Sequence, residues 1–378
     1  MAASTPRLSP AQLAAGLRAW LGDQGDAWPP AGAQGPVDPL TAAFCRGRVA
    51  ALARSEVLQA KLSQELGDHD LAWQPLGHVL AVVTEGDHLG VVAAMVAAAL
   101  TGNRLTLKAR HHLGSLQALR DALGWTPEQC RIADWDSAGQ DDGAWLAGVD
   151  GVVLAGSEAL IRHYRQVVRP GVRLIEYGPR LSAALLCTWP EDTAEQARCV
   201  DALVRDTVLF AQGVCSSPQG VWVPDQAAAR ALHEALASRL DALPPLPEAT
   251  RLAQWPEVQA LALRHRLTGG APVAWSAQTG WTSAILEPED ASPTWRGFRI
   301  RVGGWVALNR LPAMPQTLGL WPAAAARPAQ ARAFHSCAWG RMHERPLLAP
   351  HDGQWELTQW VHRLSHDASP SHLGEGAL

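Results

Sequence analysis

Short apolar runs alternate with amphipathic or alanine-rich stretches through the middle of the chain. Five runs predict buried strands, at 77–84 (GHVLAVVT), 104–107, 131–133, 151–155 (GVVLA) and 172–176. The stretches between them predict helices at 89–100, 113–123, 140–147 and 157–167. Strands that alternate with helices indicate βαβ units and a parallel sheet. Ligands of such sheets bind beyond the carboxyl ends of the strands.

The flanking regions show other patterns. Residues 1–70 are polar and predict helices around a Pro/Gly-rich loop at 28–39. The second half predicts a helix at 193–210, a strand at 221–223, a helix at 227–240, a loop at 242–247 and a mixed segment at 250–320. The sequence shows no internal repeat, and its polar end, 366–378, predicts a frayed tail.

Composition narrows the class of protein. The 378 residues are 47% hydrophobic and 18% charged, which is typical of a globular protein large enough for two domains. A net charge of −4 without a basic block argues against nucleic acid as a partner. The longest apolar stretch, 89–100, is too short to span a bilayer. The first twenty residues lack the continuous apolar run of a secretory signal, so we expect a cytoplasmic location.

Cysteine spacing points to a nucleophile rather than to a metal or a disulfide scaffold. The six cysteines are scattered without a CxxC pair, so we expect no metal site. Cys215 lies in QGVCSSPQ (212–219), where a predicted helix has ended and Gly213 permits a tight turn. A nucleophilic thiolate needs such exposure and nearby backbone N–H groups. The alternative is a small buried hydrophobe, the commoner role of a free cysteine.

QGVCSSPQ resembles the nucleophile loop of the LuxC-type acyl-CoA (fatty-acid) reductases, which resemble the aldehyde dehydrogenase superfamily. Further segments resemble family motifs in the same order: 100–108 (LTGNRLTLK), 154–161 (LAGSEALI), 176–182 (EYGPRLS), 315–320 (PQTLGL) and 340–353 (GRM…PLLAPHDG). The resemblance covers about residues 70–360. It implies an α/β, aldehyde-dehydrogenase-like fold, with a helical segment and nucleotide-binding domain at 1–178 and a catalytic domain at 179–365.

The resemblance also implies roles for individual residues. Cys215 would accept the acyl group, and Glu176 matches the general base of oxidising members or serves only to hold the structure. Gly156 and Ser157 would place the pyrophosphate at a helix N-terminus, although a Gly-Ser turn is also an ordinary helix cap. Lys108 matches a lysine near the adenosine ribose, or is a surface lysine.

Arg110 and His111, which follow Lys108, bear on the choice of cofactor. Many NAD-dependent relatives have a glutamate at the position of His111, which here follows Arg110. A basic pair accepts a 2′-phosphate, so we expect NADPH. The alternative is a basic helix start without a role in binding.

The sequence departs from the family pattern at two positions. Asp87 stands where the family has the asparagine of the oxyanion hole, and an ionised carboxylate cannot donate to an oxyanion. Arg180 stands where the family usually has lysine. The segment 351–353 (HDG) predicts a turn, in a C-terminal part that the resemblance places near the active site, and we assign it no catalytic role.

The predicted function is NADPH-dependent reduction of an acyl thioester to an aldehyde. The partner would be acyl-CoA or an acyl-carrier protein, and the resemblance permits a homo-oligomer. One alternative is an oxidising aldehyde dehydrogenase. Another is a degenerate, non-catalytic member that acts as a binding partner, which the substitution at Asp87 favours.

Overall fold

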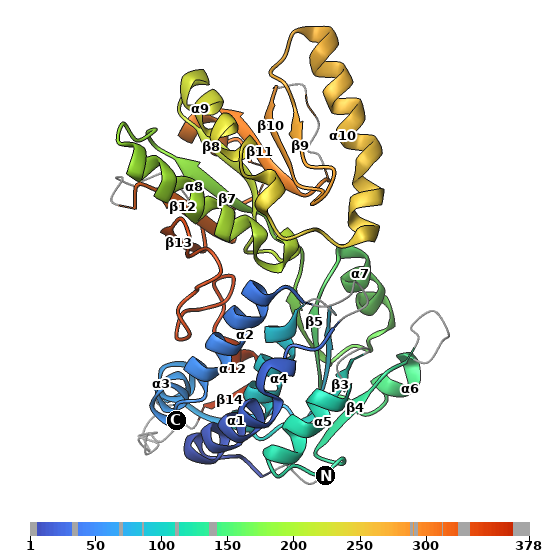
Figure 1. Cartoon of the computed structure of the whole chain (residues 1–378). Helices are drawn as coiled ribbons and strands as arrows, with labels where there is room; N and C mark the ends of the chain where they lie inside the picture. The colour runs from blue at the N-terminus through green and yellow to red at the C-terminus, as the bar shows by residue number, and fades with distance from the viewer. Residues whose placement is uncertain are drawn as a thin grey trace, which may run out of the picture.

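The computed structural model describes residues 6–31, 37–67, 71–84, 87–109, 113–135, 142–287, 290, 294–311, 313–323 and 333–365. The chain forms two stacked lobes, each built on a mainly parallel sheet (Figure 1). The lower lobe has five strands in the order β4-β3-β2-β5-β6. These are β2 (His78–Val83), β3 (Arg104–Lys108), β4 (Cys130–Ala133), β5 (Gly151–Ala155) and β6 (Arg173–Tyr177), all parallel.

Helices cover both faces of the five-stranded sheet, because alternate residues of each strand point to opposite faces. In β2, Val79 and Ala81 pack with α4 (His88–Thr101) and α5 (Leu113–Ala122). Leu80 and Val82 pack instead with α6 (Asp142–Leu146) and α7 (Glu158–Val167). The expected α/β pattern of alternating strands and helices is confirmed.

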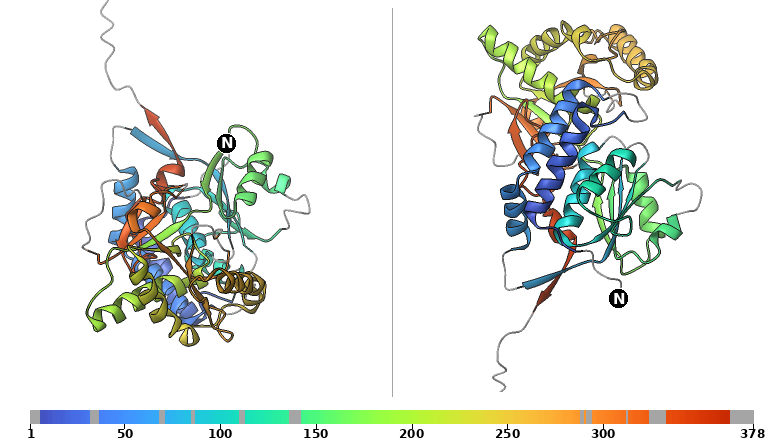
Figure 2. Two further views of the ribbon diagram at one scale, coloured as in Figure 1. Left: turned by 90° about the horizontal axis from the view of Figure 1, so that it is seen from above. Right: turned by 60° about the horizontal axis from the view of Figure 1, so that its bottom comes forward.

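Three N-terminal helices enlarge the core on the α4 side of the lower lobe (Figure 2). They are α1 (Pro10–Gln24), α2 (Pro39–Leu52) and α3 (Ser55–Leu66). Ser9 caps α1 in a capping box with Gln12, which satisfies donors that the first helical turn leaves free. Buried Trp20 donates from Nε1 to the Ser115 carbonyl at 3.0 Å and so ties α1 to α5.

The upper lobe contains a seven-stranded sheet in the order β13-β12-β7-β8-β11-β10-β9, parallel except for β9. Its strands are β7 (Ser182–Leu186), β8 (Pro218–Val223), β9 (Ala274–Trp275), β10 (Thr282–Leu286), β11 (Gly297–Val302), β12 (Thr317–Trp321) and β13 (His335–Ala338). Its helices are α8 (Thr193–Val208), α9 (Gln226–Ala237), α10 (Glu248–Thr268) and α11 (Gly304–Leu308), with a 3₁₀ turn at Leu240–Ala242. The chain changes sheets between Tyr177 and Ser182.

After β13 the chain returns to the lower lobe. There α12 (Glu356–Gln359) precedes β14 (Val361–Ser365), which pairs antiparallel with β1 (Leu71–Pro75). Figure 2 shows this two-stranded ribbon projecting from the lobe. The expected tail at 366–378 lies outside the described residues.

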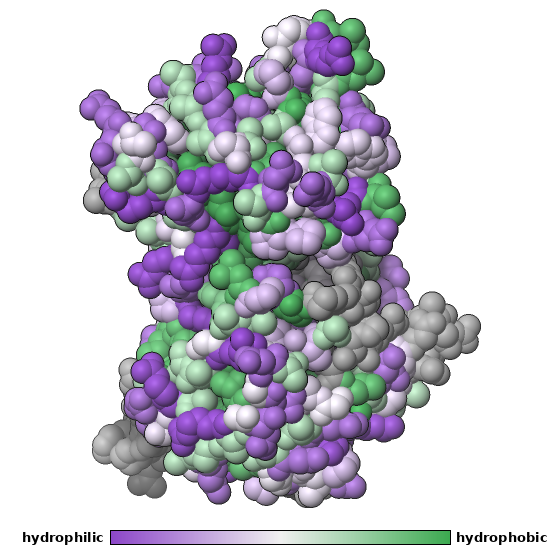
Figure 3. Space-filling view, in the orientation of Figure 1, coloured by the Kyte–Doolittle hydropathy of each residue, from purple (hydrophilic) through white to green (hydrophobic). Residues whose placement is uncertain are grey.

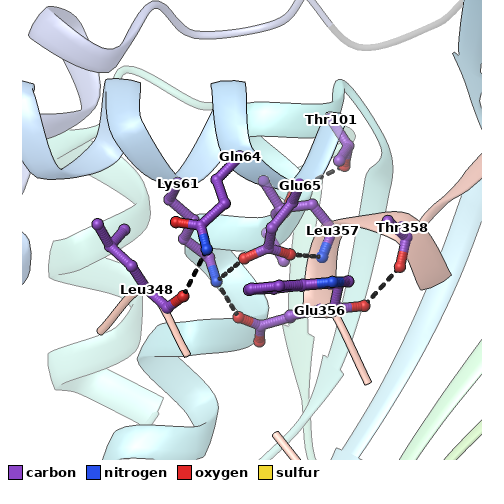
Figure 4. Close-up of polar contacts among 10 residues, drawn as sticks. Lys61, Gln64, Glu65, Thr101, Leu348, Glu356, Leu357 and Thr358 are labelled. Atoms are coloured by element: carbon purple, nitrogen blue, oxygen red, sulfur yellow. Dashed lines mark hydrogen bonds and ion pairs between the residues drawn. The ribbon is translucent and has the colours of Figure 1, made fainter. Parts of the chain in front are cut away.

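A buried ion-pair cluster fastens the returning segment to α3 (Figure 4). Lys61 Nζ lies 2.6 Å from Glu65 Oε1 and 3.1 Å from Glu356 Oε2. Glu65 also accepts the backbone N–H of Leu357 at 2.6 Å. The N-terminal helices and the C-terminal segment thus form one packed unit around α4. Across the described ranges, no helix combines the length and the apolar character needed to cross a bilayer.

Candidate active site

The loop that carries Cys215 has an unusual backbone. After α8, a short 3₁₀ turn (Leu209–Gln212) holds Phe210, Ala211 and Gln212 at φ 58°, 46° and 56°. Three successive non-glycine residues in the left-handed region cost free energy, so other contacts must hold them there. The predicted helix at 193–210 therefore ends at Val208.

Gln212 supplies much of that support. Its buried side chain donates from Nε2 to the carbonyls of Pro218 and Gly297, at 2.7 and 3.0 Å. Its Oε1 accepts the N–H of Gly297 at 2.6 Å. The Arg296 guanidinium donates to the Gln212 carbonyl. The glutamine of the QGVC motif thus fastens the loop to the start of β11.

The Cys215 thiol is half-buried where the two lobes meet. Its Sγ accepts the backbone N–H of Arg180 at 3.4 Å, and Ser182 Oγ donates to the Cys215 carbonyl at 2.6 Å. Burial raises the pKa of the Cys215 thiol, and the charges of Asp352 and Asp87 raise it further. The N–H of Arg180 and its guanidinium act against this rise. An amide that contacts the sulfur stabilises a thiolate.

Asp352 belongs to the HDG turn, which the structure brings to the nucleophile. Asp352 has a φ of 51°, and its side chain is 6% exposed. Its Oδ2 lies 3.4 Å from Arg180 Nε, and its Oδ1 accepts Gln316 Nε2 at 2.8 Å. Next to it, the His351 ring stacks on Tyr177 with centroids 4.8 Å apart. Three segments with family resemblance (176–182, 315–320 and 340–353) therefore meet around Cys215.

A second polar chain holds the other side of the nucleophile loop. His343 Nε2 donates to the Asp206 carbonyl at 2.8 Å, because a carbonyl can only accept. Its Nδ1 must then accept, so Ser216 Oγ donates to it at 2.8 Å. Burial lowers the pKa of His343 to about 4, which keeps the ring neutral. Sequence reasoning missed His343, although its position in the GRM…PLLAPHDG segment was a usable signal.

Asp87 is the N-cap residue of α4. Its Oδ1 accepts the N–H of Gly90 at 2.8 Å, as an N-cap does. A Cβ on Gly90 would lie 2.2 Å from the Asp87 carboxylate, so the capping turn is tightly closed. Burial raises the pKa of Asp87, while the N–H groups of Gly90 and Leu89 lower it. The carboxyl group accepts from its own helix, where an oxyanion hole would need a donor.

The Glu176 carboxylate pairs with an arginine of α7. Its two carboxylate oxygens accept Arg165 Nε at 2.7 Å and Arg165 Nη2 at 2.5 Å. This bidentate pair joins the end of β6 to α7. It favours the alternative in which Glu176 serves only to hold the structure.

The residues expected to bind cofactor lie at the carboxyl edge of the five-stranded sheet. Gly156 follows β5, and Ser157 caps α7 by accepting the N–H of Leu160 at 3.2 Å. A Cβ on Gly156 would lie 2.8 Å from the end of the Leu160 side chain and 3.0 Å from the Thr84 methyl group, so the turn is closely packed. Lys108 ends β3 with its Nζ 4.6 Å from the Trp135 ring centroid. Arg110 and His111 lie outside the described residues.

A turn between a buried parallel strand and a helix N-terminus fits a pyrophosphate, because free N–H groups and the helix dipole favour anions. Among the described residues, no group of three His, Cys, Asp or Glu side chains could hold a metal ion. All six cysteines are free thiols.

Comparisons with known proteins give one family and one fold. Residues 41–363 match the model of the family described as acyl-CoA reductase (LuxC). No curated protein matches the chain. Among solved structures, an oxidoreductase from Marinobacter aquaeolei aligns with a TM-score of 0.70 and 13% identity, over 96% of this chain and 86% of the other.

Two NADP-bound structures align similarly. Succinic semialdehyde dehydrogenase from Streptococcus pyogenes, in complex with NADP+, gives a TM-score of 0.69 and 14% identity, over 94% of this chain and 89% of the other. Glyceraldehyde-3-phosphate dehydrogenase GapN from Methanocaldococcus jannaschii, complexed with NADP, gives 0.67 and 8% identity, over 94% and 88%. At these identities the likeness establishes the fold, which is that of the aldehyde dehydrogenases, as expected.

Proposed function

Because the chain belongs to the LuxC acyl-CoA reductase family, we propose that it reduces an acyl thioester to an aldehyde with NADPH through an acyl group on Cys215. The observation that carries the proposal is the contact between the Cys215 sulfur and the N–H of Arg180, on a loop held by Gln212 and His343. A half-buried loop thiol with an amide donor at its sulfur is suited to nucleophilic attack.

In the first step the Cys215 thiolate attacks the thioester carbonyl. A bond forms between the sulfur and the acyl carbon, and the bond to the sulfur of coenzyme A or of a carrier protein breaks. The departing thiolate takes up a proton from solvent. We assign the developing negative charge on the acyl oxygen to backbone N–H groups of the nucleophile loop, because the Asp87 carboxyl faces its own helix.

Bound NADPH would supply the hydride that converts the acyl group to an aldehyde and frees Cys215 as a thiolate, ready for the next attack. Gly156 and Ser157 would hold its pyrophosphate, and Lys108 its ribose. A reductase does not hydrolyse its acyl-enzyme, so it does not need Glu176 to activate water. The pairing of Glu176 with Arg165 supports reduction over the oxidising alternative.

The test is a mass spectrum of the intact protein after incubation with acyl-CoA without cofactor. We expect one added acyl group, located on Cys215 by peptide mapping and absent from Cys215→Ala. Cys337→Ala is the matched control, since Cys337 is another half-buried free thiol and should not change acylation. Acylation at another residue would contradict the assignment to Cys215. No acylation at all, from CoA or carrier-protein donors, would favour the non-catalytic alternative.

Cofactor choice has a separate test. If Arg110 and His111 bind the 2′-phosphate, NADPH should be used in preference to NADH. A charge-assisted contact is worth about 1.5–3 kcal/mol, so Arg110→Ala should reduce the preference roughly ten- to a hundredfold. Equal use of NADH and NADPH by the unaltered protein would contradict this role.

A further inference from the structure

A pocket of about 350 Å³ lies between the first half of α10 and the β9–β10 turn. Its volume is within the range of small-molecule sites. Trp255 and Trp275 form one wall, edge to face, with centroids 6.0 Å apart. They remain 38% and 42% exposed, and Leu252 beside them is 68% exposed. In Figure 3, which colours each residue by its hydropathy, hydrophobic residues appear at the upper right, over α10.

Two polar atoms of the pocket lack partners among the described residues. Thr282 is 1% exposed, and its Oγ1 makes no hydrogen bond. The buried Nε of Arg251 is also unpaired, although Nη1 of the same side chain donates to the Gln278 carbonyl. The neighbouring Ser276 Oγ, by contrast, donates to Asp241 at 2.6 Å. Both residues line the pocket, so a ligand bound there can supply the acceptor that these two donors lack.

The pocket lies on the same sheet edge as the nucleophile. Parallel strands β8, β11 and β10 begin at Pro218, Gly297 and Thr282, and Thr282 is in register with Gly297. Gln212 binds Pro218 and Gly297 from the nucleophile loop. Thr282 is therefore two strand spacings, about 10 Å, from the start of β8, which directly follows that loop.

Hydrogen bonds connect the pocket to the loop. Gln254 lines the pocket, donates to the Gly280 carbonyl at 2.5 Å, and accepts the N–H of Arg296 at 2.8 Å. The Arg296 guanidinium donates in turn to the Gln212 carbonyl. A ligand that displaced Gln254 would thus displace Arg296, which holds the Gln212 carbonyl in the nucleophile loop.

We propose that this pocket is a second ligand-binding site, which takes a small aromatic carboxylate and communicates with the nucleophile loop. The two indoles suit a flat ring. The Arg251 Nε–H and the Thr282 hydroxyl can both donate to one carboxylate, and the arginine makes that contact charge-assisted. Glu248 also lines the pocket and is exposed to solvent, which screens its negative charge.

The binding test uses 4-fluorobenzoate as probe, followed by fluorine NMR with the full-length protein. We expect its signal to broaden on addition of protein, while fluorobenzene, which lacks the carboxylate, broadens much less. Thr282→Val should weaken binding roughly tenfold, the value of about one hydrogen bond. Its melting temperature should stay equal or rise, because the variant removes a buried hydroxyl that has no partner.

Thr279→Val is the matched control. Thr279 lies near the pocket, but its hydroxyl donates to the Leu240 carbonyl at 2.8 Å. This variant should lose thermal stability and keep its affinity for the probe. If 4-fluorobenzoate does not bind, or binds equally to Thr282→Val, the pocket holds only water and the proposal is wrong.

Communication is measured by the rate at which iodoacetamide alkylates Cys215, which requires no reductase activity. Saturating 4-fluorobenzoate should change this rate at least twofold in the unaltered protein and leave it unchanged in Gln254→Ala. A rate that does not respond in the unaltered protein would overturn the link to the loop. Because neither readout requires turnover, failure of this proposal is distinguishable from failure of the reductase proposal.

Discussion

The backbone N–H of Arg180 contacts the sulfur of Cys215 at 3.4 Å, while its side chain reaches Asp352, also at 3.4 Å. One residue therefore joins Cys215 to a buried carboxylate. The amide stabilises a thiolate, and the negative charge of Asp352 opposes it. Burial raises the pKa of the thiol most, and these two contacts adjust it in opposite directions.

Asp352→Asn should lower the pKa of Cys215. The substitution removes a negative charge that raises the thiol pKa and leaves the Arg180 guanidinium uncompensated. The rate of iodoacetamide alkylation should then reach its half-maximum at a lower pH than in the unaltered protein. Asp201→Asn is the control, because it removes an equal charge from an exposed ion pair with Arg239. An unchanged or raised midpoint in Asp352→Asn would show that Asp352 does not act on the thiol.

Asp87→Asn should leave the fold and the acylation rate nearly unchanged. Asparagine caps helices as well as aspartate does, so the free energy of unfolding should change by less than about 0.5 kcal/mol. Acylation, measured at a pH where the thiol is fully ionised, should change less than roughly tenfold. An oxyanion-hole donor is worth about 10²–10³-fold, so a gain of that size would place residue 87 at the oxyanion after all.

Glu176→Gln should reduce aldehyde formation less than roughly fivefold, because the carboxylate pairs with Arg165. Stability should fall by under about 1 kcal/mol, since Arg165 is 61% exposed and exposed pairs contribute little. Arg165→Met breaks the same pair from the other side and should have the same effect on steady-state kinetics. A hundredfold loss confined to Glu176→Gln would indicate a direct chemical role.

His343 should make the folded protein sensitive to acid. Its pKa is about 4 in the folded chain and 6.5 when unperturbed, so between these values only the unfolded chain binds the proton. Stability from this residue is complete above pH 6.5 and is lost as the pH falls toward 4. Between pH 7 and pH 5 the unaltered protein should lose roughly 2 kcal/mol more than His343→Gln, measured by urea unfolding. An equal loss of stability in the two proteins between pH 7 and pH 5 would contradict this role of His343.

Lys61→Met should destabilise the protein by about 3–5 kcal/mol, because it leaves Glu65 and Glu356 close together without their cation. Arg341→Met removes one cation from an exposed pair with Glu344 and should cost less than about 1 kcal/mol. Urea unfolding of the two variants measures how much free energy of unfolding each has lost. Equal losses would mean that the cluster contributes no more than a surface pair.

The sequence pattern predicted the five-stranded sheet well, because its strands are short apolar runs between helices. It did not predict β7, although this strand lies inside the seven-stranded sheet. SAALL is buried throughout and rich in alanine, so its periodicity does not distinguish a strand from a helix. The pairing of β1 with β14 was also missed, since about three quarters of the chain separates the two strands.

The sequence predicted those residues of the candidate active site whose chemistry depends on the residue types within one short segment. Cys215 in its glycine-containing loop is such a case. The hydrogen bond from Ser216 to His343, which are 127 residues apart, was not predictable. The pairing of Glu176 with Arg165 in the preceding helix was not predictable either, although only 11 residues separate the two. A carboxylate at a strand end has the same local sequence whether it faces a substrate or an arginine.

The return of the C-terminal segment to the lower lobe affects how the chain folds during synthesis. Trp360 packs in the core of the lower lobe, and its carbonyl accepts Leu76 N at 3.2 Å and Asn103 Nδ2 at 2.8 Å. Domains usually fold from the N-terminus as they leave the ribosome. Here the lower lobe, although synthesised first, cannot close its core until the ribosome has released residue 365. A chaperone that covers the exposed side of α4 during that interval would be expected to raise the yield of folded protein.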